Sequence, residues 1–316
     1  MDDMALLHHW TISTSRTIVG FAGADDWWQQ AFPRIAFGHP FVMHGILSLT
    51  ALHLAHLDLH NRRRYMADAA RRHNQALHGF GEAIANISDD NSDAIFACAS
   101  MNIVYVFGMY GHLYESCNGD SSHSARNARV LGAEWIPMIR GIEAVLKPIY
   151  DRMRLGPLSP LLNLSNWEEL DPNTEESDNG DRQLCKIRTT WDDGSDAEIY
   201  DQTLYLLRKC HAYMRQYMKA EEVVAEPAPY NRAWSGPMMW LHFLPEDFLV
   251  RLHQRQPPAL VLFAHFGVLL HAVEDQWIFR GWGRSIVDVV SDLLGDYWQP
   301  WMEWPKEAVG FTSRSS

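Results

Sequence analysis

Apolar residues recur at helical spacing along most of this chain. Between residues 65 and 87 the apolar positions step by three or four, and a group of arginines lies on the opposite face. These positions are Tyr65, Ala69, His73, Ala76, Phe80, Ile84 and Ile87. The pattern predicts one long amphipathic helix. Strand-like alternation is scarce elsewhere, so the sequence predicts an all-α fold.

Other segments predict further helices. Three of them, at about 40–59, 91–113 and 258–273, are apolar nearly all round, which is typical of buried helices. Pro40 suits the first turn of such a helix, where its missing N–H leaves no hydrogen bond unmade. The remaining predicted helices lie at about 128–146, 196–219, 237–244, 246–254 and 282–297.

Two stretches interrupt this helical pattern. The first, at about 148–194, is rich in proline and acidic residues, and its densest part is Glu168 to Asp181. The second, at about 221–236, contains Pro227 and Pro229. Such composition is typical of exposed loops. The sequence therefore predicts a single domain over residues 1–316, with about ten helices and two long surface loops.

The charge balance argues against direct binding to nucleic acid. The chain carries a net charge of −12, whereas proteins that bind a duplex usually present a basic patch. The basic cluster consists of Arg62, Arg63, Arg64, Arg71 and Arg72. We interpret it as the solvated face of one helix.

The cysteines and the apolar runs indicate no disulfide framework and no membrane span. Cys98, Cys117, Cys185 and Cys210 show no CxxC spacing, so we expect free thiols and a reducing compartment. The longest apolar run, Ala259 to Val273, is shorter than the ~20 residues that a spanning helix needs.

Common catalytic and metal-binding patterns are also missing. The chain contains no nucleophile elbow, HExxH, phosphate-binding loop or complete GxGxxG. His53, His56 and His60 share one predicted helix, but they alternate with leucine and alanine, so we interpret them as core or boundary histidines. We therefore expect no cofactor and no enzymatic activity.

One acidic motif offers an alternative. Asp89, Asp90 and Asp93 match the DDxxD pattern of class I terpene cyclases, whose carboxylates bridge Mg²⁺ ions that hold a diphosphate. These residues would then be catalytic and would bind the metal. Aspartates at a helix start also have a simpler explanation, because they complement the helix dipole.

Several segments, in order along nearly the whole chain, resemble one family. They are Leu6–Trp10, Thr14–Thr17, His39–Leu47, Ala51–Ala55, Asn91–Ala97, Trp135–Gly141, Gly156–Leu158, Pro258–Leu270, Trp277, Gly281–Trp282 and Trp301–Pro305. Together they are similar to the regulatory domain of fungal zinc-cluster (Zn2Cys6) transcription factors of the sterol uptake control type.

This resemblance implies an all-α, ligand-sensing domain that binds an apolar small molecule, such as a sterol or terpenoid, in a hydrophobic pocket. The apolar helices are the natural walls of such a pocket. The candidate ligand-binding residues are Phe41, Phe96, Met101, Tyr105, Trp240, Phe266 and Leu270. A nuclear or cytoplasmic location and a protein partner or homodimer fit the same interpretation.

The family normally carries a six-cysteine zinc cluster before this domain, which the four scattered cysteines here cannot form. Two explanations are open: the chain is a shortened form of a longer protein, or it is a stand-alone relative. In the second case the same scaffold is available for an enzyme of secondary metabolism, most concretely the Mg²⁺-dependent cyclase.

Overall fold

The computed structural model describes residues 3–18, 27–113, 122–162, 164, 166–218 and 233–311. Every regular element within these residues is a helix, and none of them forms a strand. The predicted all-α fold is therefore confirmed.

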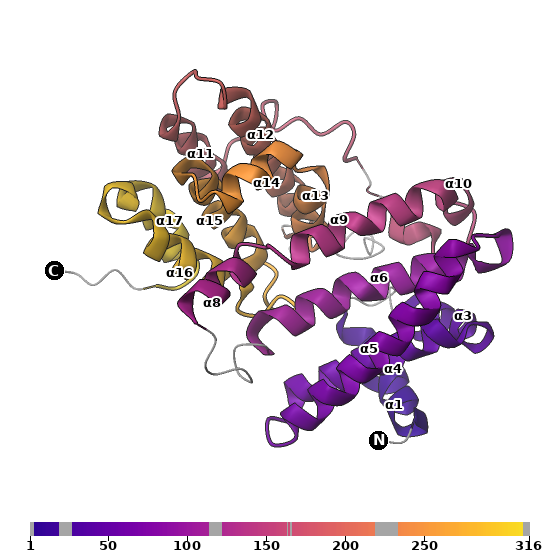
Figure 1. Ribbon diagram of the computed structural model, residues 1–316. Helices are drawn as coiled ribbons and strands as arrows, with labels where there is room; N and C mark the ends of the chain where they lie inside the picture. Colours follow the sequence, from indigo (N-terminus) through magenta and orange to yellow (C-terminus); the bar gives the residue numbers. More distant parts are fainter. Residues whose placement is uncertain are drawn as a thin grey trace.

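The N-terminal helices gather at one end of the molecule (Figure 1). They are α1 (Asp3–His9), η1 (Trp10–Thr14), α2 (Ser15–Thr17), η2 (Trp27–Ala31), α3 (Phe32–Gly38), α4 (Pro40–Leu57), α5 (Arg62–Ala85), η3 (Asp89–Asn91), α6 (Ser92–Gly108) and η4 (Met109–Leu113). The turn between α4 and α5 is fixed by Asp58, whose carboxylate accepts hydrogen bonds from the backbone N–H groups of His60 and Asn61.

The central helices continue from this group. They are α8 (His123–Val130), α9 (Trp135–Leu146), η5 (Lys147–Ile149), α10 (Tyr150–Met153) and η6 (Ser159–Leu162). Helix α9 runs beside α6 and leads from α8, which contacts α16, back to α10, which contacts α6 (Figure 1).

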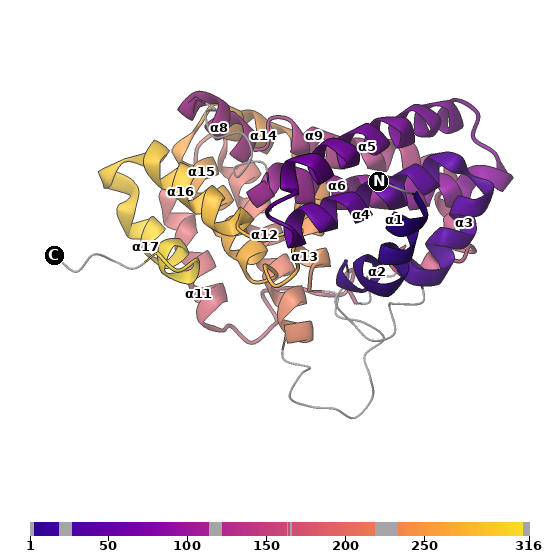
Figure 2. The same cartoon turned by 90° about the horizontal axis from the view of Figure 1, so that it is seen from below.

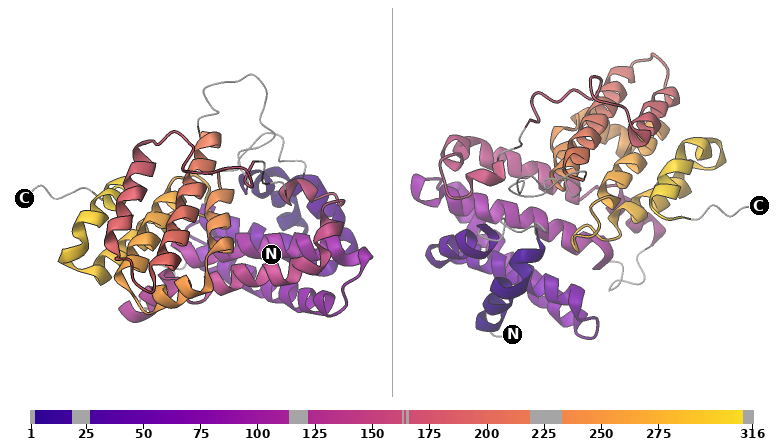
Figure 3. Two further views of the ribbon diagram at one scale, coloured as in Figure 1. Left: turned by 90° about the horizontal axis from the view of Figure 1, so that it is seen from above. Right: turned by 180° about the vertical axis from the view of Figure 1, so that it is seen from behind.

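The C-terminal helices gather at the other end, as Figure 2 and both views of Figure 3 show. They are α11 (Asn179–Lys186), η7 (Ile187–Thr190), α12 (Ala197–Met218), α13 (Ser235–Phe243), α14 (Glu246–His253), α15 (Pro257–His271), α16 (Trp282–Leu294), η9 (Asp296–Trp298) and α17 (Gln299–Ala308). Helix α15 is buried over almost its whole length, as its apolar sequence predicts.

Two predicted helices end or divide at glycines. The segment predicted as one helix at 128–146 consists of α8 and α9, which are separated by a turn in which Gly132 has φ +84°. The predicted helix at 282–297 stops at Leu294, because Gly295 has φ +72°. Both φ values lie in the left-handed region, which glycine adopts without a steric penalty.

The acidic stretch at 148–194 differs from the predicted long loop. It contains α10, α11 and short 3-10 turns, and its acidic part is bound to α12. The Arg208 guanidinium lies 2.7 Å from the carboxylate of Asp181, and the Arg215 guanidinium lies 3.1 Å from that of Asp178. Although burial acts in the opposite direction, hydrogen bonds from Arg208 and Ser177 hold the pKa of Asp181 below its usual range. Paired charges thus help to fix the acidic part of this segment, in addition to the buried side chains of Trp167, Leu170 and Leu184.

The second predicted loop, at 221–236, lies mostly outside the described residues. Of its residues, 233–236 are described, and α13 already begins at Ser235. Cys117 also lies outside the described residues. Cys98 and Cys210 are buried free thiols, as expected, and Cys185 is exposed.

Two helical stretches of the described chain, Pro40–Leu57 and Asp89–Gly111, are long and apolar enough to cross a membrane by length and composition alone. In the fold, 61% of the first and 78% of the second are buried inside the protein. Burial among neighbouring helices therefore explains their apolar sequence.

Helices α15 and α16 pack closely because each contributes a glycine to the contact. A Cβ atom on Gly283 would collide with the carbonyl oxygen of Gly267 and would lie 2.7 Å from the Cβ atom of His271. Real Cβ atoms do not approach other atoms this closely, so the two helix backbones can meet here only because residue 283 has no side chain beyond hydrogen.

We therefore expect Gly283→Ala to lower the free energy of unfolding by about 1–3 kcal/mol, the usual cost of overpacking. Gly141→Ala in α9 is a matched control, because a Cβ there meets no atom within 4 Å. That control gains helix propensity and should raise stability by about 1 kcal/mol. Urea denaturation measures both changes, and equal stability of the two variants would contradict the close contact.

Candidate ligand-binding site

A small apolar cavity lies where four parts of the chain meet. Its volume is about 30 Å³. The wall comes from the N-terminal segment, from α6, from the start of α13 and from the turn that precedes α16. The lining residues are Ile18, Trp28, Ile103, Val104, Phe107, Trp234, Met238, Ile278 and Phe279. The cavity thus lies at the junction of the N-terminal and C-terminal helices.

Local sequence places these side chains in the wall. Ile103 and Phe107 stand one helical turn apart on α6, and Trp234 and Met238 have the same spacing at the start of α13. Gly281, with φ +78°, reverses the chain after Phe279 and starts α16. Helical spacing and one glycine turn therefore bring apolar side chains to a common point.

One side of the cavity is held by a cluster of aromatic rings. Phe107 makes edge-to-face contact with Phe279 at 5.1 Å, and Trp135 makes edge-to-face contact with Trp282 at 4.9 Å. The Trp282 indole N–H donates a hydrogen bond of 2.9 Å to the Phe107 carbonyl oxygen. These contacts fix α6 against α16, so this part of the wall has little freedom to move.

The opposite side is more adaptable. Ile103, Trp234 and Met238 are only half-buried, whereas the other lining residues are buried. Methionine has three rotatable bonds and accommodates changes in shape. We therefore expect the start of α13 to yield before the aromatic cluster does.

Two tryptophans of the wall have unsatisfied indole groups. The Nε1 atoms of Trp28 and Trp234 are buried and have no hydrogen-bond partner among the described residues. The Trp28 ring is held in place by stacking on Phe32 at 4.1 Å, and its backbone carbonyl accepts a hydrogen bond from the Trp10 indole. A buried donor without a partner costs free energy that an incoming acceptor would recover.

The ligand-binding residues predicted from the sequence lie in two other groups. In the first, Met101 packs on Gly45, Phe41 packs on Gly79 and Tyr105 stacks on a histidine. Phe96 is buried on α6 with this group.

The second group lies in the C-terminal half. Trp240 stacks on Phe266 at 4.2 Å, and Leu270 is buried on the same helix as Phe266. None of the seven predicted residues lines the cavity. Helix α6, one of the predicted walls, does contribute to it. Some of the missed residues, such as Trp28 and Phe279, lie in turns and short helices, which carry no periodic signal, whereas Ile103, Val104 and Phe107 lie on α6.

The three aspartates of the alternative interpretation lie at a helix start. Asp89 and Asp90 belong to η3, and Ser88 and Asn91 form a capping box around it. Asp89 is paired with Arg152, whereas Asp93 is half-buried in the first turn of α6, where burial raises the pKa of its carboxyl group.

In the described part of the chain, no group of three or more His, Cys, Asp or Glu side chains is arranged to hold a metal ion. The geometry of the aspartates is that of a helix cap. It gives no support to the cyclase interpretation.

Of the three histidines predicted to share one helix, His53 and His56 lie on α4, whereas His60 lies in the turn that follows it, because α4 ends at Leu57. His53 is buried, and its Nδ1 atom lies 3.0 Å from the Thr14 hydroxyl. His56 is half-buried beside Trp277, and His60 is exposed. Burial lowers the pKa of His53 to about 4, so this ring is neutral at physiological pH.

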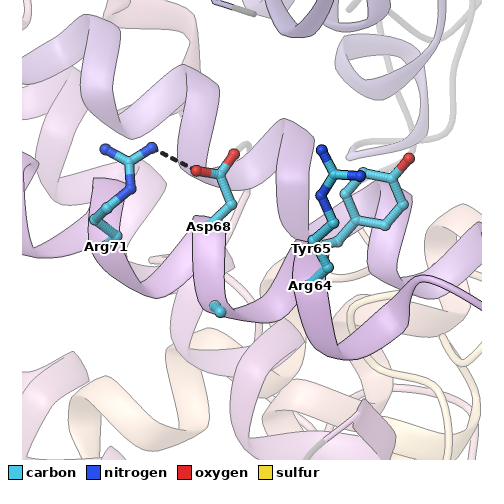
Figure 4. A pocket seen from close by; sticks show the side chains of 5 residues that line it. Arg64, Tyr65, Asp68 and Arg71 are labelled. Carbon is cyan, nitrogen blue, oxygen red and sulfur yellow. Dashed lines mark hydrogen bonds and ion pairs between the residues drawn. The ribbon is translucent and has the colours of Figure 1, made fainter. Parts of the chain in front are cut away.

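The arginine cluster lies on α5, around a shallow hollow of about 250 Å³ (Figure 4). Arg71 points toward Asp68 and pairs with it at 2.5 Å. Arg72 is buried and pairs with Asp68 and Asp3, and the Nε atom of Arg62 donates to a backbone carbonyl. Arg72 and Arg62 thus hold α5 against α1 and α4, whereas Arg63, Arg64 and Arg71 are exposed, as a solvated helix face requires.

Comparison with known proteins places this fold in a class. Residues 5–157 match the family described as "Fungal specific transcription factor domain". The chain thus carries a regulatory domain of transcription-factor type, and the resemblance found in the sequence is confirmed.

The individual relatives agree with this class. The chain is 24% identical, over 96% of its length, to a protein of Gibberella zeae named "Zn(2)-C6 fungal-type transcription factor". It is also 31% identical, over 48% of its length, to "Sterol uptake control protein 2" of Candida albicans, and 28% identical, over 47%, to the protein of the same name in Saccharomyces cerevisiae. The chain spans 61%, 19% and 15% of these three relatives. These comparisons give no support to a terpene cyclase.

Three buried histidines predict a dependence of stability on pH. Burial lowers the pKa values of His53, His73 and His265 to about 4. The unfolded chain binds protons at these rings below about pH 6.5, whereas the folded chain does not until about pH 4. The free energy of unfolding therefore has its full value, as far as these three rings are concerned, above pH 6.5. It falls as the pH drops toward 4, by up to about 1.4 kcal/mol per pH unit for each ring.

Urea denaturation between pH 7 and pH 4.5 measures this slope. His73→Phe keeps an aromatic ring for the stack on Tyr105, which has a centroid distance of 3.6 Å, but it removes one titrating group. It should reduce the slope by the share of one ring, up to about 1.4 kcal/mol per pH unit. His78→Gln is the control, because the His78 side chain is 78% exposed. An unchanged slope in His73→Phe would contradict the assignment.

Proposed function

We propose that this domain is a ligand sensor, in which an apolar, sterol-like small molecule enters at the cavity between α6 and α13. The observation that carries the proposal is the position of the cavity. Its wall combines residues from the N-terminal helices, such as Trp28, with residues from the C-terminal half, such as Phe279. An occupant of this site would therefore contact both halves of the domain.

The names of the relatives support the class of ligand. Two of them are named sterol uptake control proteins, and they match this chain over about half of its length. The wall of the cavity is also chemically suited to such a molecule, because every lining side chain is aliphatic, aromatic or thioether.

Binding requires the cavity to widen. A volume of about 30 Å³ is far below the roughly 300–1,000 Å³ that pockets for drug-sized ligands provide. The half-buried side chains of Trp234 and Met238 form the wall that moves, while the cluster around Phe107 holds its position. A ligand with higher affinity for the widened state shifts the domain toward that state. The packing of the two halves then reports whether the ligand is present.

The sensor acts on transcription without contacting DNA through this chain. A net charge of −12 disfavours contact with phosphates. The transcription-factor relatives support a nuclear site of action. A protein partner or a second copy of the chain receives the signal, and the binding step itself needs no cofactor.

Sterol binding is testable with dehydroergosterol, a fluorescent sterol that accepts energy from tryptophan. Saturable energy transfer is expected, together with stabilisation of about 2.7 kcal/mol when the free sterol reaches 100 times its Kd. Lipid extraction followed by mass spectrometry identifies any molecule that copurifies with the protein. The proposal would be wrong if dehydroergosterol produced neither energy transfer nor stabilisation.

The position of the site is tested by filling the cavity. Val104→Ile adds one methylene group to the wall, which should stabilise the free protein by up to about 0.8 kcal/mol and weaken sterol binding several-fold. Val290→Ile is the matched control, because Val290 is fully buried away from the cavity. It should destabilise the protein by overpacking and leave the affinity unchanged. Equal affinities in the two variants would place the sterol elsewhere.

A further inference from the structure

One face of helix α5 is strongly positive in a protein that is acidic overall. Residues 62–72, at the start of the helix, contain five arginines and one acidic residue, Asp68, whereas the whole chain carries a net charge of −12. Two of the arginines are used inside the fold, because Arg72 is buried against Asp3 and Asp68 and Arg62 donates to a backbone carbonyl. The other three form an exposed arginine face, which consists of Arg63, Arg64 and Arg71.

The positive charge of the arginine face is not neutralised from within the described chain. Arg63 and Arg64 make no hydrogen bond or ion pair with any residue that the structure describes. Arg71 pairs with Asp68, but the same carboxylate also pairs with Arg72, so one negative charge serves two guanidinium groups. The arginine face therefore presents uncompensated charge to its surroundings.

The position of these arginines works against the stability of the helix. Arg62, Arg63 and Arg64 occupy the first turn of α5, which has no acidic residue, and the preceding Asn61 side chain makes no capping hydrogen bond. The start of a helix is the positive end of its dipole, so carboxylates stabilise it and arginines do not. Solvation alone would be served by any polar residue. The three arginines therefore indicate a role outside the fold, since departures from local preference are expected at functional sites.

Apolar surface adjoins the charge. Leu57 and Leu59 stand in the turn that leads into α5, and their exposed fractions are 56% and 69%. The shallow hollow of about 250 Å³ between Arg64 and Arg71 is lined by Tyr65 and Ala67 as well as by charged side chains (Figure 4). The surface thus offers guanidinium groups and apolar contacts side by side.

We propose that the arginine face docks an acidic segment of a partner protein that also carries leucine-like side chains. Its carboxylates pair with Arg63 and Arg64, because a guanidinium group matches the geometry of a carboxylate. Its apolar side chains contact Leu57, Leu59 and the hollow. No residue lines both this hollow and the cavity between α6 and α13, so the inference stands or falls independently of the proposed function.

A short acidic segment fits this face better than a larger anionic partner does. At physiological ionic strength, screening limits electrostatic contacts between exposed charges to about 8 Å, so a short segment experiences mainly the local positive charge. A nucleic-acid duplex or a second copy of the chain approaches over a larger area and is repelled by the overall charge of −12.

The test uses a short fluorescein-labelled peptide of alternating glutamate and leucine pairs, with binding followed by fluorescence anisotropy. We expect saturable binding to the unmodified protein. In Arg63→Glu combined with Arg64→Glu the affinity should fall roughly tenfold or more, because attraction becomes repulsion. Lys147→Glu combined with Arg280→Glu is the matched control, since it makes the same change in net charge at two exposed positions outside α5. Equal losses in the two variants would overturn the inference.

The stability of the same variant separates a docking role from a structural one. Urea denaturation should find Arg63→Glu combined with Arg64→Glu at least as stable as the unmodified protein, because glutamate complements the helix dipole. A variant that loses peptide binding and keeps its stability supports docking. A clear loss of stability would show that the arginines serve the fold instead, and the inference would be wrong.

Three further measurements distinguish the occupant. A peptide with serine in place of leucine should bind several-fold more weakly, because it loses the apolar contacts. Equal binding of the two peptides would reduce the site to charge alone and contradict the inference. So would tighter binding of a DNA duplex than of the peptide at the same salt concentration, or a dimer in sedimentation velocity that the Arg63→Glu and Arg64→Glu changes abolish.

Discussion

The hydrogen bond from the Trp282 indole to the Phe107 carbonyl joins the two ends of this molecule. Phe107 lies where α6 gives way to the π-helical turn η4, a point at which the regular α-helical hydrogen-bond pattern is interrupted. A donor from α16 meets that carbonyl at 2.9 Å, and the rings of Phe107, Trp135, Phe279 and Trp282 pack around the bond. The bond is buried, so a shift of the helices that broke it without admitting water would leave both groups unpaired.

This constraint determines what the cavity is able to do. Phe107 and Phe279 belong both to the aromatic cluster and to the cavity wall, so one wall is as rigid as the connection between the two halves. The opposite wall, at the start of α13, has half-buried side chains and no such cluster. Under the proposed function, a ligand that entered between one fixed wall and one adaptable wall would displace the adaptable wall only.

The acidic segment is held in the fold in a different way, because its sequence has no strong apolar pattern. Its carboxylates would repel one another in isolation, and they are ordered because Arg208, His211 and Arg215 project from one helix toward them. The pKa of Asp178 lies below its usual range for the same reason, since hydrogen bonds and nearby positive charges outweigh the effect of its burial. The contact lies in the pairing of two segments, so it has no signature in either segment alone.

The sequence by itself determined the fold class and the positions of the long helices. Helices α5, α4 and α15 correspond to the apolar periodicity of 65–87 and to the apolar runs at 40–59 and 258–273. They could be predicted because a helix face repeats every three to four residues, so its pattern is visible within a short stretch of sequence. The order of short motifs also identified the family, which the comparisons confirm.

Only the tertiary structure decided where the candidate site lies. The seven residues predicted as ligand contacts are large and apolar, but in the fold they fill two parts of the core, as Met101 does against Gly45 and Trp240 against Phe266. The cavity instead depends on Trp28, Trp234 and Phe279, which stand in turns and short helices far apart in the sequence. Whether an indole N–H finds a partner also depends on atoms contributed by distant segments, as Thr17 does for Trp277. A cavity and an unpaired donor are properties of packing between segments, so no periodicity along the chain encodes them.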